Sequence, residues 1–311
     1  MSKNLKYGVV GTGAIGGYYG GRLANIGKDV HFLYHSEYEW VKMHGLKVYS
    51  CNGDFYLPQI NAYHSTEDMP QCDVVLVALK STQNDKLKAL LTPICHKDTV
   101  VVLVQNGLGL EAELAQDFPN LSIAGGMAFI CSSRVGKGEI NHADYGALTV
   151  GFHQHAQMEV LQQMKEDFDA ANVPFYVIED LNLYRWRKLV WNIPYNGLTV
   201  ALDTSTDKLM QNPSSRQLVQ DLMWETVLGA RACGANISDD FVEKMMLSTD
   251  QMKPYSPSMK LDWDNHRKLE VRAIYSNPIQ AAKAQGVHLQ KVEMLEQMLL
   301  FKENEREQNQ K

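Results

Sequence analysis

The chain is poor in cysteine, and its few cysteines follow no recognisable spacing. The 311 residues include five, namely Cys51, Cys72, Cys95, Cys131 and Cys233. Their number is odd and no CxxC pair occurs, so neither a disulfide framework nor a cysteine-rich zinc site is indicated. We expect reduced, mostly structural thiols, as in a cytosolic protein.

Long hydrophobic runs and basic segments are also missing. No apolar run approaches the roughly 20 residues that span a bilayer, and residues 1–6 lead directly into a candidate strand, leaving no room for a signal peptide. The formal net charge is −6 without a basic stripe, which argues against a nucleic-acid partner. His153 and His155 have no carboxylate or cysteine nearby, so we expect no metal site. These absences predict a cytoplasmic protein without a membrane or nucleic-acid partner.

A glycine-rich turn stands between a strand and a helix near the N-terminus. The apolar segment 6–10 is followed by Gly11-Thr12-Gly13-Ala14-Ile15-Gly16. Gly11 permits the tight turn, Gly13 lets the backbone approach a pyrophosphate, and Gly16 lets the helix pack closely on the strand. The helix N-terminus then presents N–H groups to the anion. We predict a dinucleotide site; a ligand-free turn or a site for another adenine cofactor is the alternative.

The first part of the chain alternates strands and helices. Segments 74–79 and 100–104 are apolar throughout, as in parallel strands covered on both faces. Helical patterns follow near 83–91 and 109–118, which indicates a Rossmann-type doubly wound α/β sheet. The remaining elements expected here are short antiparallel strands over 125–151 around a Gly136-Lys137-Gly138 turn, a helix over 156–171 and a strand over 173–178.

The second part is predicted to be all helical. Helices are expected over 183–202, 213–233, 239–249, 267–285 and 289–305. Pro213 suits a first helical turn, and Gly234 and Gly286 suit helix ends. With a boundary at 178–182, we expect a dinucleotide-binding domain over 1–180 and a helical substrate-binding and dimerisation domain over 181–311, with a homodimer as one assembly it could form. The polar tail 302–311 is expected to be a solvated, fraying end.

The end of the second strand bears on the choice of cofactor. The strand 30–34 is followed by His35-Ser36-Glu37. An acidic residue directly at this point would favour NAD, whereas a donor or cation would favour the 2′-phosphate of NADP. His35 and Ser36 could donate to a phosphate and Lys80 could add charge, so we predict NADPH; Glu37 keeps NAD open.

Three polar clusters are candidates for the chemistry. Lys80 and Asn106 follow the two apolar strands, where open α/β sheets bind their ligands; a solvated lysine and simple turn chemistry are the alternatives. Lys188, Asn192 and Asn196 recur at four-residue steps and therefore share one face of a helix. One cation and two amides among apolar residues suit a small substrate that carries a carbonyl and a carboxylate.

These motifs in this order resemble the ketopantoate reductase family (2-dehydropantoate 2-reductases). The resemblance covers essentially the whole chain and extends to Ser258-Met259-x-x-Asp262 and to Glu270. It implies an NADP-dependent oxidoreductase that reduces a small 2-oxo acid, 2-dehydropantoate, to pantoate, a step of pantothenate (coenzyme A precursor) biosynthesis.

The resemblance also implies residue roles. Lys188 looks like the proton donor to the substrate carbonyl. The implied substrate ligands are Asn106, Lys188, Asn192, Asn196 and Ser258. The implied cofactor ligands are Gly11, Thr12, Gly13, Ala14, Ile15, Gly16, Lys80, Asn106, Ser132 and Glu270.

Several positions depart from the family pattern. His35 stands where the family has arginine, Arg272 where it has an acid, Tyr275-Ser276 where it has Asn-Gly, and Thr206 where it has a further asparagine. The change at His35 weakens the prediction of NADP. Because the other changes are expected around the substrate, a reductase of another branched 2-oxo acid is an alternative. A dinucleotide-binding sensor without catalysis is a second alternative, which the proton donor Lys188 disfavours.

Overall fold

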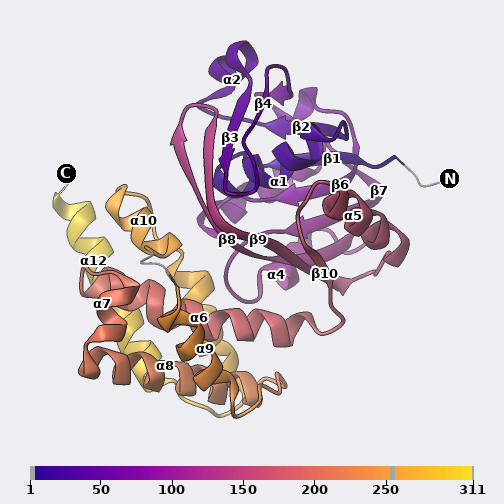
Figure 1. Ribbon diagram of the computed structural model, residues 1–311. Helices are drawn as coiled ribbons and strands as arrows, with labels where there is room; N and C mark the ends of the chain where they lie inside the picture. The colour runs from indigo at the N-terminus through magenta and orange to yellow at the C-terminus, as the bar shows by residue number, and fades with distance from the viewer. Residues whose placement is uncertain (1–3, 253–255, 310–311) are drawn as a thin grey trace. The chain divides into compact units, whose positions relative to one another are not determined.

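The computed structural model describes residues 4–252 and 256–309 and divides into two compact units (Figure 1). The first unit comprises Met1–Gln105 and Leu110–Leu181, and the second comprises Asn106–Gly109 and Asn182–Lys311. The short segment Asn106–Gly109 therefore packs with the helical unit although it lies between elements of the first.

The first unit is built on one ten-stranded sheet. Its strands are β1 (Lys6–Val10), β2 (Asp29–Leu33), β3 (Leu46–Ser50), β4 (Phe55–Leu57), β5 (Asn61–Tyr63), β6 (Cys72–Val77), β7 (Cys95–Leu103), β8 (Ser122–Gly136), β9 (Glu139–Gln154) and β10 (Phe175–Val177). The order is β4-β3-β9-β8-β7-β6-β1-β2-β5, with β10 beside β9. The strands from β5 to β8 in this order are mutually parallel. The continuous apolar segments of β6 and β7 predict this arrangement for those two strands.

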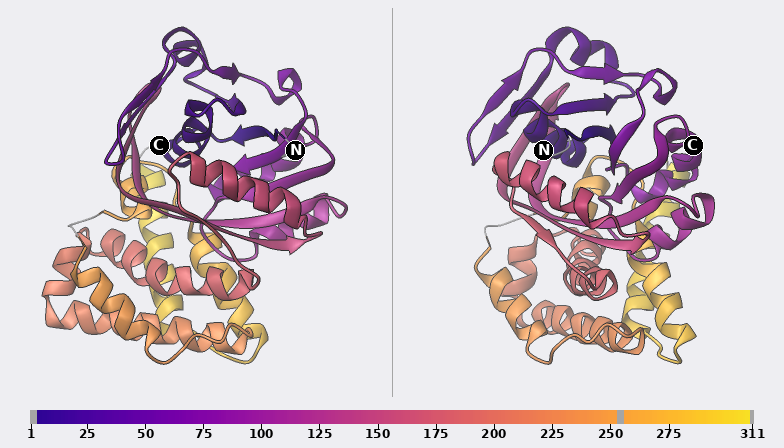
Figure 2. Two further views of the ribbon diagram at one scale, coloured as in Figure 1. Left: turned by 45° about the vertical axis from the view of Figure 1, so that its right-hand side comes forward. Right: turned by 90° about the vertical axis from the view of Figure 1, so that its right-hand side faces the viewer.

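Helices cover this sheet. They are α1 (Ala14–Asn25), α2 (Tyr38–His44), α3 (Leu87–Leu91), α4 (Leu110–Asp117) and α5 (Met158–Ala170), with 3₁₀ turns at Thr66–Asp68 (η1) and Ser81–Lys86 (η2). The sheet curls around α1, which contacts β1 and β2 as well as β3, β4, β8 and β9 (Figure 2). Tyr18 and Tyr19 on α1 are fully buried by this curvature. The unit is thus a Rossmann-like half-barrel.

The far end of the sheet differs from the prediction. Instead of short strands over 125–151, β8 and β9 are antiparallel strands of 15 and 16 residues. Irregularities in their register, for example between Phe129 and Ile130, interrupt the alternation of apolar and polar residues. The expected short strands were therefore wrong, because a bulged long strand looks like several short ones in sequence.

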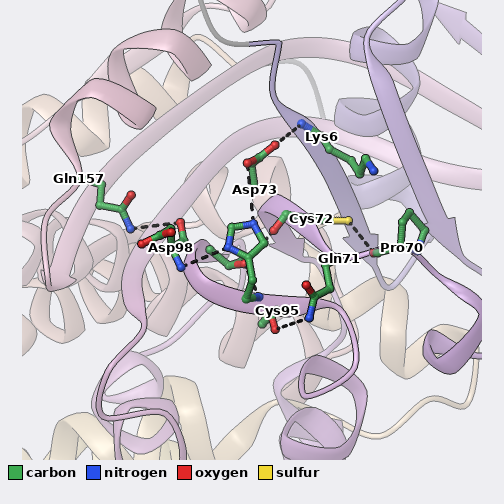
Figure 3. Close-up of polar contacts among 10 residues, drawn as sticks. Lys6, Pro70, Gln71, Cys72, Asp73, Cys95, Asp98 and Gln157 are labelled. Atoms are coloured by element: carbon green, nitrogen blue, oxygen red, sulfur yellow. Dashed lines mark hydrogen bonds and ion pairs between the residues drawn. The ribbon is translucent and has the colours of Figure 1, made fainter.

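Side chains tie together the amino-terminal edge of the central strands (Figure 3). The Lys6 main-chain N–H donates to Asp73 (2.9 Å), and the Thr99 hydroxyl donates to the carbonyl of Cys72 (2.7 Å). Burial raises the pKa of the Cys72 and Cys95 thiols to about 12, and all five cysteines are free. This edge is structural, and the predicted site residues Lys80 and Asn106 follow the opposite ends of these strands.

The second unit is helical. It contains α6 (Leu181–Ala201), α7 (Thr206–Gln211), α8 (Pro213–Ala232), α9 (Phe241–Asp250), α10 (Ser258–Asp264), the π-helical segment η3 (Arg272–Ser276), α11 (Asn277–Ala284) and α12 (Gln290–Asn309). As predicted, Pro213 lies in the first turn of α8, where the Asn212 side chain caps the N–H groups of Ser214 and Ser215. None of the helices within residues 4–252 and 256–309 has both the length and the apolar character of a membrane span.

Two helix predictions need correction. The segment 267–270 is not helical, and the expected helix over 267–285 begins only at Val271, with a π-helical stretch inside it. The tail is helical through Asn309 rather than frayed, and residues 310–311 lie outside the described residues. Tertiary contacts stabilise it: Glu303 accepts the main-chain N–H of Leu269 (2.7 Å), and the Arg306 guanidinium lies 4.4 Å from the centre of the Trp263 ring.

Candidate active site

The glycine turn has the geometry that a pyrophosphate site requires. Gly11 has φ +97°, and a Cβ there would lie 2.4 Å from the main-chain nitrogen of Leu79. A Cβ at Gly16 would lie 2.4 Å from the carbonyl oxygen of Gly11, whereas one at Gly13 would meet nothing within 4 Å. The first turn of α1 has no acidic residue and no side-chain cap. The turn is therefore tight on the protein side and open where an anion would approach.

Two hydroxyl groups attach this turn to the sheet. Thr12 donates to the carbonyl of Leu33 at the end of β2 (2.9 Å), and Ser132 on β8 donates to the carbonyl of Ala14 (3.2 Å). The turn and these two strands thus form one connected structure in the first unit.

The ends of β6 and β7 are joined by Gln105, which belongs to the predicted polar cluster at 105–107 but was given no role of its own. The Gln105 amide donates to the carbonyl of Leu79 (2.8 Å) and to the side chain of Asn84 (2.7 Å). Lys80, the next residue after Leu79, is half-buried at the start of η2. Gln105 therefore helps to set the course of the chain at Lys80; its place next to Asn106 was the available signal.

The carboxylate of Glu37, near the end of β2, is bound by other residues of the protein. One oxygen of the Glu37 carboxylate is paired with Arg134 Nη1 (2.9 Å), and the other accepts the main-chain N–H of Gly138 (3.2 Å). Glu37 is buried, whereas His35 and Ser36 are exposed. Glu37, the residue that kept NAD as an alternative cofactor, thus uses its carboxylate in contacts within the protein.

In the helical unit, Lys188, Asn192 and Asn196 all lie on α6 at the predicted four-residue steps. Lys188 is half-buried, and Asn192 and Asn196 are buried. Asn196 Oδ1 accepts the main-chain N–H of Met259 at 3.1 Å, which places Ser258, the first residue of α10, beside this row. The row therefore combines a cation, a hydroxyl and two amides.

The environment of Lys188 lowers the pKa of its ammonium to about 7. Burial is the main cause, the neighbouring Arg185 cation lowers it further, and the Glu270 carboxylate raises it. Glu270, which the resemblance assigns to cofactor binding, thus also lies close enough to act on the charge of Lys188. A lysine of this kind both gives and regains a proton near neutral pH.

The segment with Asn106 is held by the π-helical stretch. Leu108 N–H donates to the Ala273 carbonyl (2.9 Å), and the Asn277 side chain donates to the Leu108 carbonyl (2.7 Å). Within the helix, the Asn277 N–H bonds to Arg272, and Pro278, five residues beyond Ala273, has no N–H to offer. The Ala273 carbonyl is consequently available to Leu108, and Asn106 is positioned by residues close in sequence to Glu270.

The residues that depart from the family pattern lie in different places. Tyr275 is fully buried and its hydroxyl donates to the Ile193 carbonyl (2.8 Å), so it belongs to the core. Arg272 is exposed, Ser276 donates to Glu296, and Thr206 is buried at the start of α7.

Among the described residues, no group of three His, Cys, Asp or Glu side chains could hold a metal ion. Two surface cavities of the helical unit, of 460 and 620 Å³, contain none of the predicted site residues in their linings.

Comparison with known proteins supports the resemblance found in the sequence. The family described as "Ketopantoate reductase PanE/ApbA" matches residues 7–155, and its C-terminal family matches residues 180–303. A 2-dehydropantoate 2-reductase of Nostoc sp. is 49% identical over 301 residues, covering 95% of this chain and 94% of the relative. The crystal structure of 2-dehydropantoate 2-reductase from Geobacter metallireducens is 39% identical with a TM-score of 0.91 and covers 95% of this chain and 99% of that chain. The enzyme of the same name from Methylococcus capsulatus is 30% identical with a TM-score of 0.90 and covers 97% and 98%. The predicted resemblance and fold class are confirmed.

Proposed function

Since the chain belongs to the ketopantoate reductase family, we propose that it reduces 2-dehydropantoate to pantoate with NADPH, a step of pantothenate biosynthesis. The observation that carries this proposal is the row on α6. It contains a lysine whose pKa is lowered to about 7, next to buried amides and a serine hydroxyl.

The first unit would hold the cofactor. The open turn from Gly11 to Gly16 fits the pyrophosphate. Ser132 on β8 is hydrogen-bonded to this turn, and Lys80 follows the carboxyl end of β6. When bound, NADPH supplies the hydride for a carbonyl carbon.

The second unit would hold the substrate. The amide of Asn192, the NH₂ group of Asn196 and the hydroxyl of Ser258 can donate hydrogen bonds to a carboxylate or accept one from a hydroxyl group. Asn106 comes from the segment that packs on the same unit. These neutral donors orient a small 2-oxo acid without burying a second fixed charge.

Lys188 would complete the reaction. Hydride addition leaves negative charge on the carbonyl oxygen, which the Lys188 ammonium stabilises and then protonates. The Glu270 carboxylate favours the protonated form of Lys188 and so raises the fraction of the donor that carries a proton near neutral pH.

The test is steady-state kinetics with NADPH and a panel of 2-oxo acids. We expect the highest kcat/KM with 2-dehydropantoate. A higher kcat/KM with another branched 2-oxo acid would identify that acid as the substrate, and the protein would still be a 2-oxo acid reductase. Tight dinucleotide binding without turnover of any 2-oxo acid would instead support a sensor.

We also propose a cytoplasmic homodimer. The five free thiols suit a reducing compartment. Met294, Met298 and Phe301 are exposed on α12 at steps of four and three residues, which gives one apolar face for a second copy. Light scattering should give twice the chain mass, and Phe301→Glu should shift the protein toward the monomer; a monomeric wild type would contradict the dimer.

A further inference from the structure

We propose that Arg134 binds the 2′-phosphate of the adenosine ribose of NADPH, in place of the arginine that the family carries where this chain has His35. This assignment rests on the proposed function, because it concerns the cofactor of that reaction. It follows from the pairing of Arg134 with Glu37 beside the end of β2.

The end of β2 is where a dinucleotide-binding fold meets the adenosine ribose. In such folds, an acidic residue there accepts hydrogen bonds from the ribose hydroxyls, and a cation there accommodates a 2′-phosphate. The hydrogen bond from Thr12 to Leu33 ties the glycine turn to this strand end. The pyrophosphate and ribose positions are therefore parts of one connected structure.

Glu37, the first acid after the end of β2 in sequence, cannot serve a ribose hydroxyl as it stands. Both Glu37 oxygens are used, one by Arg134 and the other by the N–H of Gly138. The side chain of Glu37 is 9% exposed, whereas that of Arg134 is 46% exposed. Solvent, and hence a ligand, meets the guanidinium rather than the carboxylate.

Arg134 is brought to this place by the β8–β9 hairpin. The turn of the hairpin is fixed by two hydrogen bonds of the Gly138 main chain. Its N–H donates to the Glu37 carboxylate (3.2 Å), and its carbonyl accepts the Lys47 N–H (2.8 Å). Figure 1 shows the far end of this hairpin next to β3 and α2. Arg134 on β8 thus lies near the end of β2, although the two segments are far apart in the sequence.

The pairing leaves Arg134 able to bind an anion. A guanidinium has five N–H donors in a planar fork, and the contact with Glu37 uses Nη1. The carboxylate holds the side chain in one orientation, so less conformational freedom is lost when a phosphate binds. His35 and Ser36 are exposed at the same strand end and can add donors.

The experiment measures dissociation constants of purified wild type, Arg134→Ala and Arg134→Lys by calorimetry. The ligands are NADPH, NADH, adenosine 2′,5′-bisphosphate and 5′-AMP. Only NADPH and adenosine 2′,5′-bisphosphate carry the 2′-phosphate. The matched control is Arg216→Ala, which removes an arginine of similar exposure (37%) paired with Asp250 in the helical unit.

We expect Arg134→Ala to weaken NADPH and adenosine 2′,5′-bisphosphate by about 10- to 100-fold, the range for a charge-assisted hydrogen bond. NADH and 5′-AMP should change less than about twofold, which also shows that the variant is folded, and Arg134→Lys should lie between wild type and Arg134→Ala. Raised ionic strength should reduce the preference of the wild type for NADPH.

Other outcomes overturn the assignment. Equal weakening of all four ligands would show a structural role, and unchanged NADPH binding would show that the pair is only an internal contact. In both cases the reductase function stands. A wild type that binds neither dinucleotide overturns the proposed function itself.

Discussion

The side chain of Asn196 accepts a hydrogen bond from the main-chain N–H of Met259, 63 positions away in the chain. One amide oxygen on α6 thereby holds the start of α10, where Ser258 lies. The Asn196 oxygen thus helps to position Ser258, and we propose that the NH₂ group of the same side chain binds the substrate.

The two roles of Asn196 predict different effects on stability for two substitutions. Asn196→Ala leaves the buried N–H of Met259 without a partner and should destabilise the protein by about 1–3 kcal/mol while raising the KM for the 2-oxo acid. Ser258→Ala should also raise KM, but its effect on stability should stay within about 0.5 kcal/mol. Urea unfolding and steady-state kinetics on both variants check this. Equal stability of the two would contradict a positioning role for Asn196.

Lys188→Ala should lower kcat by roughly 10²–10⁴-fold, the usual contribution of general-acid catalysis. The dissociation constant of NADPH should change little, because the proposed pyrophosphate site is the glycine turn rather than α6. The control is Lys283→Ala, which removes an exposed lysine on α11 and should leave kcat unchanged. Near-normal turnover of Lys188→Ala would reject the proton donor.

The pH dependence of kcat should report the ionisation of Lys188. The protonated form is the acid and its pKa is about 7, so kcat should fall about tenfold per pH unit above neutrality. Glu270→Gln removes the carboxylate that raises this pKa, so its profile should fall at lower pH. If Glu270→Gln does not shift the pH at which kcat falls, a group other than Lys188 limits the rate.

Lys188 should also reduce stability at low pH. Its pKa is lowered from 10.5 in the unfolded chain to about 7, so the cost of burying its charge is complete below pH 7 and disappears as pH rises toward 10.5. Lys188→Met should therefore be more stable than wild type at pH 6 by at least about 1 kcal/mol. The two should converge in alkaline buffer; a gap independent of pH would indicate packing instead of charge.

Gly107 should tolerate no side chain. It has φ +113°, and a Cβ would lie 2.5 Å from the carbonyl oxygen of Ala273. Gly107→Ala should cost more than about 2 kcal/mol, since backbone strain alone costs of order 1–3, and should raise KM by displacing Asn106. Gly109→Ala is the matched control, with φ +81° and only Asn277 at 3.7 Å. Similar losses in both variants would show that the contact with Ala273 is unimportant.

Local features of the chain were sufficient for several conclusions. The strand, glycine turn and helix around Gly11 are a contiguous pattern, and the four-residue steps from Lys188 to Asn196 follow from helical geometry. The apolar segments of β6 and β7 indicated buried parallel strands for the same reason. The long bulged pair β8 and β9 was missed, because bulges break the alternation on which strand prediction relies.

The sequence by itself therefore determined the fold class, the glycine turn, the row on α6 and the family. Only the tertiary structure decided that Glu37 pairs with Arg134, that Glu270 acts on the charge of Lys188, and that Ala273 receives the Leu108 N–H. Periodicity and turn residues are properties of neighbouring positions, so they can be read along the chain. Contacts between distant side chains depend on strand register and helix packing, which no local pattern specifies.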